Sequence, residues 1–395
     1  MRSNPSSDPD RIPVIAAAFR TPIGRINGSL AAIEPASLAV PLIRRILAET
    51  GIAPEAVDDV ILGNAANSAG NLARLAALEA GLPVCVPGLT VDRQCGSGLE
   101  AIALAARLVQ AGAGDIYLAG GTESTSRAHL RFRPPLAPDG VPEPVRRARM
   151  APDAIGDPDM GIAAENVAAH AGISRERQDA FALESHRRAV AARRAGRFVQ
   201  EIVPVEIPAG IVLEDECPRE NTSLEKLGAL KPVFSPDGTV TAGNACPVND
   251  GAALVLVTSR AEAERRGLPL LLEVVDSAVA GVEPALLGLG PVPAMGKLVA
   301  RNPGLDAPAV PFIEFNEAFA SQVLASLDAL GINPTAVNRE GGALALGHPY
   351  GASGAILVTR LFAQMRDAEP GTQGLAMMGI GGGMGIATLF KKTGF

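Results

Sequence analysis

The 395-residue sequence lacks long basic runs, and its formal net charge is −7. This charge argues against nucleic acid as the main partner, although a local basic patch for a phosphorylated ligand remains compatible with it. No uncharged apolar run is long enough to span a membrane, and the polar residues 1–11 lack the apolar segment of a signal peptide. We therefore expect a cytoplasmic protein with no nucleic-acid or membrane partner, and a flexible tail over residues 1–11.

Cysteine and histidine are scarce, with four residues of each. The cysteines show no close metal-type spacing and are too few for a disulfide framework in a chain of this size. We expect a reducing compartment and no bound metal; the four cysteines are Cys85, Cys95, Cys217 and Cys246. Of the histidines, His348 lies in a glycine-rich stretch, whereas His129, His170 and His186 are expected to be ordinary surface or loop residues.

What the sequence has in abundance is short apolar runs that alternate with helical patterns, punctuated by 43 glycines and 32 prolines. This alternation predicts a layered α/β fold, and the chain length suggests more than one domain. The expected strands include 14–18, 60–63, 89–91 and 116–119, and the expected helices 38–50 and 98–110. Residues 126–245 are richer in Arg, Asp and Pro, contain a helix near 175–197, and are expected to form an inserted loop domain.

The second half of the sequence repeats features of the first. Residues 270–275 resemble the first strand, 312–314 resemble 60–62, and 375–378 lead into a glycine run as 117–119 do. We expect two similar halves, 12–125 and 246–395, with an interface between them. Each half has one glycine-rich helix start, and if these face each other, Cys95 and His348 lie near a common centre.

Cys95 lies in the stretch Arg93-Gln94-Cys95-Gly96-Ser97-Gly98, just before a predicted helix. Unpaired backbone N–H groups and the positive end of the helix dipole favour a thiolate and are expected to lower the pKa of the thiol. The glycines allow a ligand to approach the backbone closely. The alternative is a buried structural cysteine, which is common for free cysteines. The glycine setting makes the two readings about equal.

Three further stretches contain candidate functional groups. His348, in Gly347-His348-Pro349-Tyr350-Gly351, can activate a thiol or donate to an oxyanion, or can be a turn residue satisfied by backbone. Asn316 follows the strand 312–314 and can hold a water or an oxyanion, or can be a helix N-cap. The run 379–385, which includes Gly381, exposes backbone N–H groups to an anion, or is only a tight turn.

Taken together, these four stretches resemble the thiolase family, and the resemblance covers nearly the whole chain. Other stretches also match, among them 20–24, 120–124, 160–166, 237–244 and 288–294. The resemblance implies a five-layer αβαβα core of two similar halves. It also implies an inserted loop domain that binds coenzyme A, and a homodimer or a homotetramer.

The resemblance implies roles for individual residues. Cys95 is the acylated nucleophile, His348 activates it, and His348 with a water held by Asn316 forms one oxyanion site. The backbone N–H groups of Cys95 and Gly381 form the second. The positions that contact coenzyme A or its pantetheine arm are Met160, Arg219, Phe234, Ala242, Cys246, Ala318 and Phe319. Coenzyme A and acyl-CoA are then substrates rather than permanently bound cofactors, and the reaction is a ping-pong condensation or thiolysis of short 3-ketoacyl-CoA.

One position departs from the family pattern. The family places a second cysteine before Ile-Gly-Gly-Gly, as the base that removes the α-proton of the second acyl group, and here that position is Gly379. A positioned acid–base group contributes about 10²–10⁴-fold to a rate. Cys246, Glu340 or a water can substitute for the missing base. The acceptor can instead be an amine, an alcohol, a thiol or a malonyl-type thioester that needs no base, or the protein can be a non-catalytic coenzyme A binder.

Overall fold

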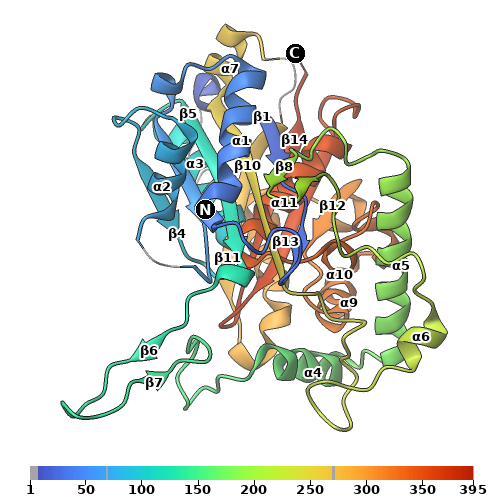
Figure 1. The fold of residues 1–395 in the computed structure, drawn as a ribbon. Helices are drawn as coiled ribbons and strands as arrows, with labels where there is room; N and C mark the ends of the chain where they lie inside the picture. The colour runs from blue at the N-terminus through green and yellow to red at the C-terminus, as the bar shows by residue number, and fades with distance from the viewer. Residues whose placement is uncertain (1–7, 68–69, 269–271, 395) are drawn as a thin grey trace.

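The computed structural model describes residues 8–67, 70–268 and 272–394, and its centre is a sheet to which both halves of the chain contribute (Figure 1). The first half supplies β1 (Pro13–Arg20), β2 (Gly24–Arg25), β3 (Asp59–Gly63), β4 (Gly88–Val91), β5 (Ile116–Ser124) and β10 (Asn249–Ser259). The second half supplies β11 (Leu272–Gly281), β12 (Phe312–Phe315), β13 (Gln373–Ile380) and β14 (Met384–Lys392).

The strand order demonstrates the internal repeat. The first half runs β3-β5-β10-β1 and the second runs β12-β13-β14-β11, with the same parallel and antiparallel pairings at each step. The short pairing of β1 with β11, at Val14–Glu273 and Ile15–Leu272, joins the two halves. The repeat expected from the sequence is confirmed, although residues 270 and 271 of its first strand lie outside the described residues.

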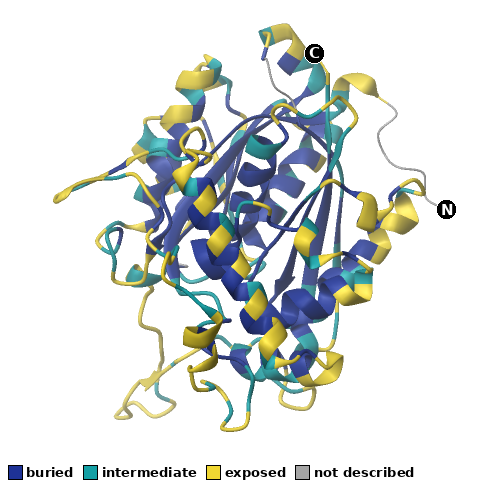
Figure 2. Cartoon of the chain, turned by 90° about the vertical axis from the view of Figure 1, so that its right-hand side faces the viewer, coloured by how far each residue is buried: buried dark blue, intermediate teal, exposed yellow. Residues whose placement is uncertain are grey.

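Helices form three layers around these strands. Helices α3 (Ser97–Gln110) and α11 (Tyr350–Gln364) lie in the middle and share one hydrophobic core with both halves of the sheet. Helices α1 (Pro35–Thr50) and α2 (Leu72–Ala80) cover the outer face of the first half, and α8 (Pro291–Arg301) and α9 (Ala320–Leu330) cover that of the second. Together with the two halves of the sheet they make the five layers that the family resemblance implied. Figure 2 shows most of the central sheet buried, with exposed residues concentrated on outer helices and loops.

Side chains alternate between the two faces of each strand, so one strand can pack into two hydrophobic cores. In β13, Leu375 and Met377 belong to the core under α8 and α9, whereas Ala376 and Met378 belong to the core around α3 and α11. Successive strand residues point to opposite faces, so a strand between two helical layers is apolar over most of its length.

Glycine allows the two middle helices to touch at their N-terminal ends. A Cβ on Gly98 would lie 2.6 Å from the carbonyl oxygen of Gly351, and a Cβ on Gly354 would lie 2.4 Å from the backbone nitrogen of Leu99. Only glycine permits this approach. The two glycine-rich helix starts therefore face each other, as the repeat predicted.

The segment between β5 and β10 lies outside the five layers, although its Ala189, Ala192 and Phe198 pack into the core around α3 and α11. It contains β6 (Phe132–Arg133), β7 (Glu143–Pro144), α4 (Met160–Ala171), α5 (Arg175–Arg194), β8 (Val205–Ile207), β9 (Gly210–Val212) and α6 (Leu224–Gly228). The hairpin of β6 and β7 projects from one side of the molecule, while α5 and α6 lie on the other (Figure 1). The remaining helices, α7 (Arg260–Arg266) and α10 (Ala343–Leu346), are short.

Two details differ from the sequence-based division of the chain. Strand β10 lies between β1 and β5, so the sheet of the first half includes residues 249–259, and a boundary at 246 is too early. The expected tail over residues 1–11 is also too long, because Arg11 is anchored to the core by a 2.6 Å ion pair with Asp115 and a 2.9 Å hydrogen bond to the carbonyl of Val109. Within the described residues, no helix has the length and apolarity needed to cross a membrane.

Candidate active site

Cys95 lies in a tight turn that leads into α3. Gln94 has φ +47°, a left-handed conformation that is unusual for a non-glycine residue and is often found at functional sites. A Cβ on Gly96 would lie 2.5 Å from the Ile380 side chain, so glycine brings this turn against the end of β13. The backbone N–H of Gly381, just beyond β13, donates a hydrogen bond to Cys95.

The environment of Cys95 does not lower the pKa of its thiol, so that expectation was wrong. Burial raises the pKa to about 11, and Glu123 and Asp92 raise it further, while the N–H groups of Gly381 and Cys95 only partly offset burial. Desolvation disfavours the thiolate more than the helix start favours it. A base must therefore accept the thiol proton when Cys95 reacts.

His348 is buried and held on three sides. Its Nδ1 lies 2.6 Å from Oγ of Ser353, its Nε2 lies 3.5 Å from Nδ2 of Asn316, and its backbone N–H donates to Oδ1 of Asn249 at 2.9 Å. Burial lowers the pKa of His348 to about 4, so the imidazole is neutral at pH 7 and can accept a proton. Sequence reasoning missed Ser353, although it lies in the glycine-rich stretch, and Asn249, for which the sequence gives no signal.

Asn316 is part of the His348 cluster rather than a helix cap. Helix α9 begins at Ala320, with Phe319 at its N-cap position and no side-chain cap. The Asn316 side chain is 1 % exposed and faces His348, and its backbone N–H donates to the carbonyl of Met377 at 3.0 Å. The N-cap alternative is therefore excluded.

A cavity of about 330 Å³ opens onto Cys95. Gly381, Met150, Met160 and Tyr350 form part of its wall. Four exposed basic residues also line it, namely His129, Arg131, Arg146 and Arg147. Tyr350 also packs edge-on against the His348 ring, with 5.3 Å between ring centroids. The Cys95 turn, the glycine run and the His348 stretch thus meet around one cavity.

Glu123 connects two segments of the cavity wall through hydrogen bonds. Its carboxylate accepts hydrogen bonds from the backbone N–H groups of Ala65, Ala66 and Gly351 at 2.9 to 3.0 Å. Ala65 and Ala66 line the cavity and Gly351 is the second residue of α11, so this buried acid fixes the start of the helix whose first residue is Tyr350. Sequence reasoning did not assign Glu123 a role, although it lies in one of the stretches that resemble the family.

Of the expected coenzyme A contacts, Met160 alone lines the cavity, and four of the others contact one another in pairs. Phe234 packs edge-on against Phe319 at 6.3 Å, and the Cys246 N–H donates to the carbonyl of Ala318 at 3.0 Å. Met160 lines the cavity, and Ala242 is exposed on the loop that leads to Cys246. Arg219 has an exposed side chain that does not line the cavity, and its backbone N–H donates to Nδ1 of His186.

The space beside Gly379 is filled by a side chain from another helix. A Cβ at position 379 would lie 2.3 Å from Nε2 of Gln322, which is on α9. Gln322 is 2 % exposed, and neither its Nε2 nor its Oε1 has a hydrogen-bond partner among the described residues. An amide does not act as a base near neutral pH, so Gln322 occupies the place of a side chain at 379 without replacing a cysteine thiol.

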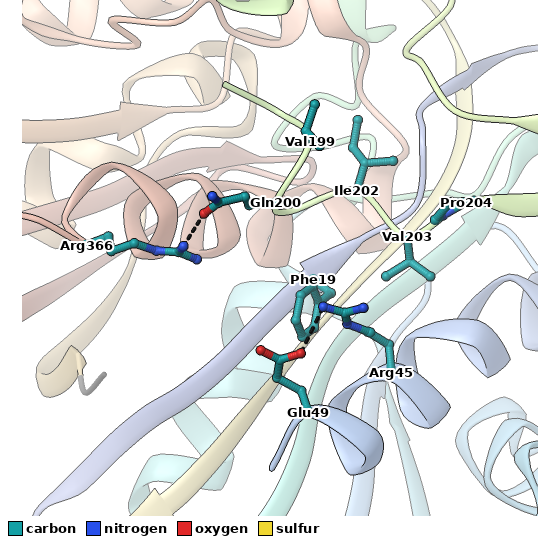
Figure 3. A pocket seen from close by; sticks show the side chains of 9 residues that line it. All are labelled: Phe19, Arg45, Glu49, Val199, Gln200, Ile202, Val203, Pro204 and Arg366. Atoms are coloured by element: carbon teal, nitrogen blue, oxygen red, sulfur yellow. Dashed lines mark hydrogen bonds and ion pairs between the residues drawn. The ribbon is translucent and has the colours of Figure 1, made fainter. Parts of the chain in front are cut away.

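Two other groups were considered as a base, and neither lines the Cys95 cavity. Glu340 forms ion pairs with Arg360 and with Arg197, the latter at 2.7 Å, and does not line the Cys95 cavity. Cys246 does not line it either, and burial raises the pKa of its thiol strongly. A second cavity, of about 320 Å³, is lined by neither cysteine nor histidine; Arg45 pairs there with Glu49, and Arg366 with Gln200 (Figure 3).

Comparison with known proteins agrees with this geometry. Residues 13–261 match the family model "Thiolase, N-terminal domain", and residues 268–392 match "Thiolase, C-terminal domain". A Staphylococcus epidermidis relative, provisionally named acetyl-CoA C-acetyltransferase VraB, is 46% identical over 382 residues, covering 96% of this chain and 98% of the relative. The relative of the same name from Staphylococcus aureus is 45% identical over 381 residues, covering 96% of this chain and 99% of the relative.

A solved structure, the acetyl-CoA acetyltransferase of Bacillus anthracis, superposes with a TM-score of 0.88 at 37% identity, covering 98% of this chain and 100% of that chain. The chain belongs to the thiolase family, and it is an acyltransferase. Thiolases act on coenzyme A thioesters and need no permanently bound cofactor.

Proposed function

We propose that this protein is a thiolase-type acyltransferase in which Cys95 carries the acyl group, acting on short 3-ketoacyl-CoA by ping-pong condensation and thiolysis. The observation that supports this most is the convergence of Cys95, the Gly381 N–H and the Tyr350–His348 pair on one cavity. The relatives named as acetyl-CoA acetyltransferases point to the same substrate class.

In the first step, His348 accepts the Cys95 proton, and the thiolate attacks the thioester carbonyl. The carbonyl oxygen becomes an oxyanion that the N–H groups of Cys95 and Gly381 stabilise, since preformed backbone donors need no reorganisation in the transition state. Collapse of this intermediate releases coenzyme A as a thiol and leaves an acyl-Cys95 thioester. The basic opening of the cavity suits the phosphates of the departing coenzyme A.

In the second step, the enolate of a second acyl-CoA attacks the acyl-Cys95, and the Asn316–His348 pair faces the developing charge. Gly379 supports a second candidate, in which the acceptor is a non-carbon nucleophile or a malonyl-type thioester, because glycine cannot remove an α-proton. We further propose that the protein is a homodimer or a homotetramer, as in the family, and that Arg219 contacts the nucleotide end of coenzyme A.

The deciding experiment is intact-protein mass after incubation with acetyl-CoA. The mass should rise by one acetyl group, and Cys95→Ala should abolish the rise while Cys85→Ala, at an exposed cysteine, retains it. Acetylation of Cys246 with Cys95 unmodified would refute the assignment. Cleavage of acetoacetyl-CoA at about 10 s⁻¹ or more, an ordinary enzymatic turnover, would exclude the second candidate.

A further inference from the structure

Tyr350 is the first residue of α11 and one of only two tyrosines in the chain. It lines the same cavity as Cys95 and Gly381, and its ring packs nearly perpendicular to that of His348, at 86°. Its hydroxyl makes no hydrogen bond with any residue that the structure describes. The residue is half-buried on the cavity wall, so this hydroxyl is free to serve a bound molecule.

Few groups on this cavity can give and take a proton. The arginines remain charged at any pH the protein tolerates, and His129 is exposed at the opening. His348 does not itself line the cavity, and it is already assigned the Cys95 proton. Cys95 is the nucleophile itself. The Tyr350 phenol is the one remaining proton-carrying side chain among those that line the described cavity.

We infer that Tyr350 is a further catalytic residue, whose phenol carries the proton of the carbon–carbon step that lacks a cysteine at position 379. This inference rests on the proposed function, since it needs an acyl-Cys95. Its substrate is the α-carbon of an acyl-CoA thioester. It also accounts for how a chain with glycine at 379 can keep both oxyanion sites in use.

The step is balanced in thiolysis. The Cys95 thiolate attacks the C3 carbonyl of a 3-ketoacyl-CoA, the C2–C3 bond breaks, and its electron pair goes to C2. The Tyr350 O–H gives its proton to C2, which releases acetyl-CoA and leaves a phenolate. The incoming coenzyme A thiol returns a proton to the phenolate and, as a thiolate, takes the acyl group from Cys95. In condensation these steps run in reverse: the Tyr350 phenol gives its proton to the departing coenzyme A thiolate, and the phenolate that this leaves removes the α-proton of the second acyl-CoA.

The surroundings of Tyr350 keep it in the acid form at the start of thiolysis. Burial raises the pKa of the phenol, and the nearby Cys246, Cys95 and Glu123 raise it further. A neutral phenol therefore meets the carbanion that forms at C2. Transfer from a positioned acid of this kind is typically worth about 10²–10⁴-fold in rate.

The test is Tyr350→Phe, which removes one oxygen and keeps the ring against His348. Acetylation of Cys95 by acetyl-CoA should stay within about twofold, whereas acetoacetyl-CoA cleavage and exchange of the acetyl-CoA α-protons with D₂O should each fall about 10²-fold. Tyr117→Phe is the matched control, because the other tyrosine is buried in the core at β5. It should change neither rate.

The outcomes separate the two proposals. If the unmodified protein does not acetylate Cys95, the proposed function fails. If the unmodified protein acetylates Cys95 but does not exchange α-protons, only the Tyr350 inference is overturned. The same conclusion follows if Tyr350→Phe exchanges α-protons as fast as the unmodified protein does. A measurement on the unaltered residue guards against misfolding of the variant. In Tyr117→Phe protein, 3-fluorotyrosine labels Tyr350 alone, and its fluorine resonance should shift on adding acetyl-CoA; an unchanged resonance would contradict the inference.

Discussion

Oγ of Ser353, in the first turn of α11, lies 2.6 Å from Nδ1 of His348, which precedes that helix. This contact fixes the plane of the imidazole so that Nε2 faces Asn316. The second nitrogen of a histidine commonly sets which nitrogen is free to act, so a hydroxyl at this position determines how His348 presents itself to Cys95 and substrate.

Ser353→Ala should therefore slow acetylation of Cys95 by about tenfold, with little change in the acetyl-CoA concentration that gives half the maximal rate. The reason is loss of orientation of His348 rather than loss of binding. Rapid-quench mass spectrometry measures both quantities. Ser353→Thr, which keeps the hydroxyl, should restore most of the rate, and Ser326→Ala, a buried serine that bonds Gly288 instead, should have no effect. Equal rates in all three variants would show that Ser353 does not position His348.

The second prediction concerns Gly379. Glycine is not required there by a left-handed backbone, because its φ lies outside the positive range; the obstacle to a side chain is the Gln322 amide, 2.3 Å from a Cβ. Gly379→Cys combined with Gln322→Ala should raise acetoacetyl-CoA cleavage at least about tenfold over Gln322→Ala alone, since a thiol adds an acid–base group. Gly379→Ala with Gln322→Ala is the matched control, with the same Cβ and no thiol. An identical gain in this control would mean that packing, not proton transfer, caused the effect.

The third prediction separates nucleotide binding from acyl chemistry. Arg219→Ala should raise the KM for acetyl-CoA about tenfold and leave acetylation by a short acetyl-pantetheine thioester unchanged, because only the former carries phosphates. Arg45→Ala removes an arginine at the distant cavity of Figure 3 and should affect neither donor. Arg146 lines the Cys95 cavity and makes no hydrogen bond or ion pair with any described residue, so Arg146→Ala tests the other basic candidate. If Arg146→Ala alone raises the KM, the phosphates lie at the cavity opening and Arg219 does not bind them.

The layered fold was predictable because local patterns in the sequence indicate its strands and helices. Apolar runs bounded by glycine and proline predict β3 and β13, and the matching helix starts at Gly98 and Gly351 predict where the two halves touch. Contacts between distant side chains carry no such local signal. Gln322 and Gly379 are far apart in the sequence, and only the packing of α9 against β13 brings the amide to the glycine. The pKa of Cys95 was misjudged for a related reason: a helix start is visible in the sequence, whereas the depth of burial that outweighs it is not.

The raised pKa of Cys95 gives the last prediction. Iodoacetamide reacts with the thiolate, so the labelling rate follows the thiolate fraction. With a pKa of about 11, that fraction is small at pH 8 and should rise about tenfold per pH unit up to pH 10. The labelling rate of a thiol with an ordinary pKa of about 8.5 would instead level off above pH 9.

Peptide mass spectrometry resolves Cys95 from the exposed Cys85, which serves as the internal reference, and near-ultraviolet circular dichroism verifies that the fold persists at each pH. If the rate at which iodoacetamide alkylates Cys95 is already at its plateau at pH 7, then Cys95 is a thiolate paired with a protonated His348. The neutral pair described above, in which His348 with its pKa near 4 accepts the proton only as Cys95 attacks, would then be wrong.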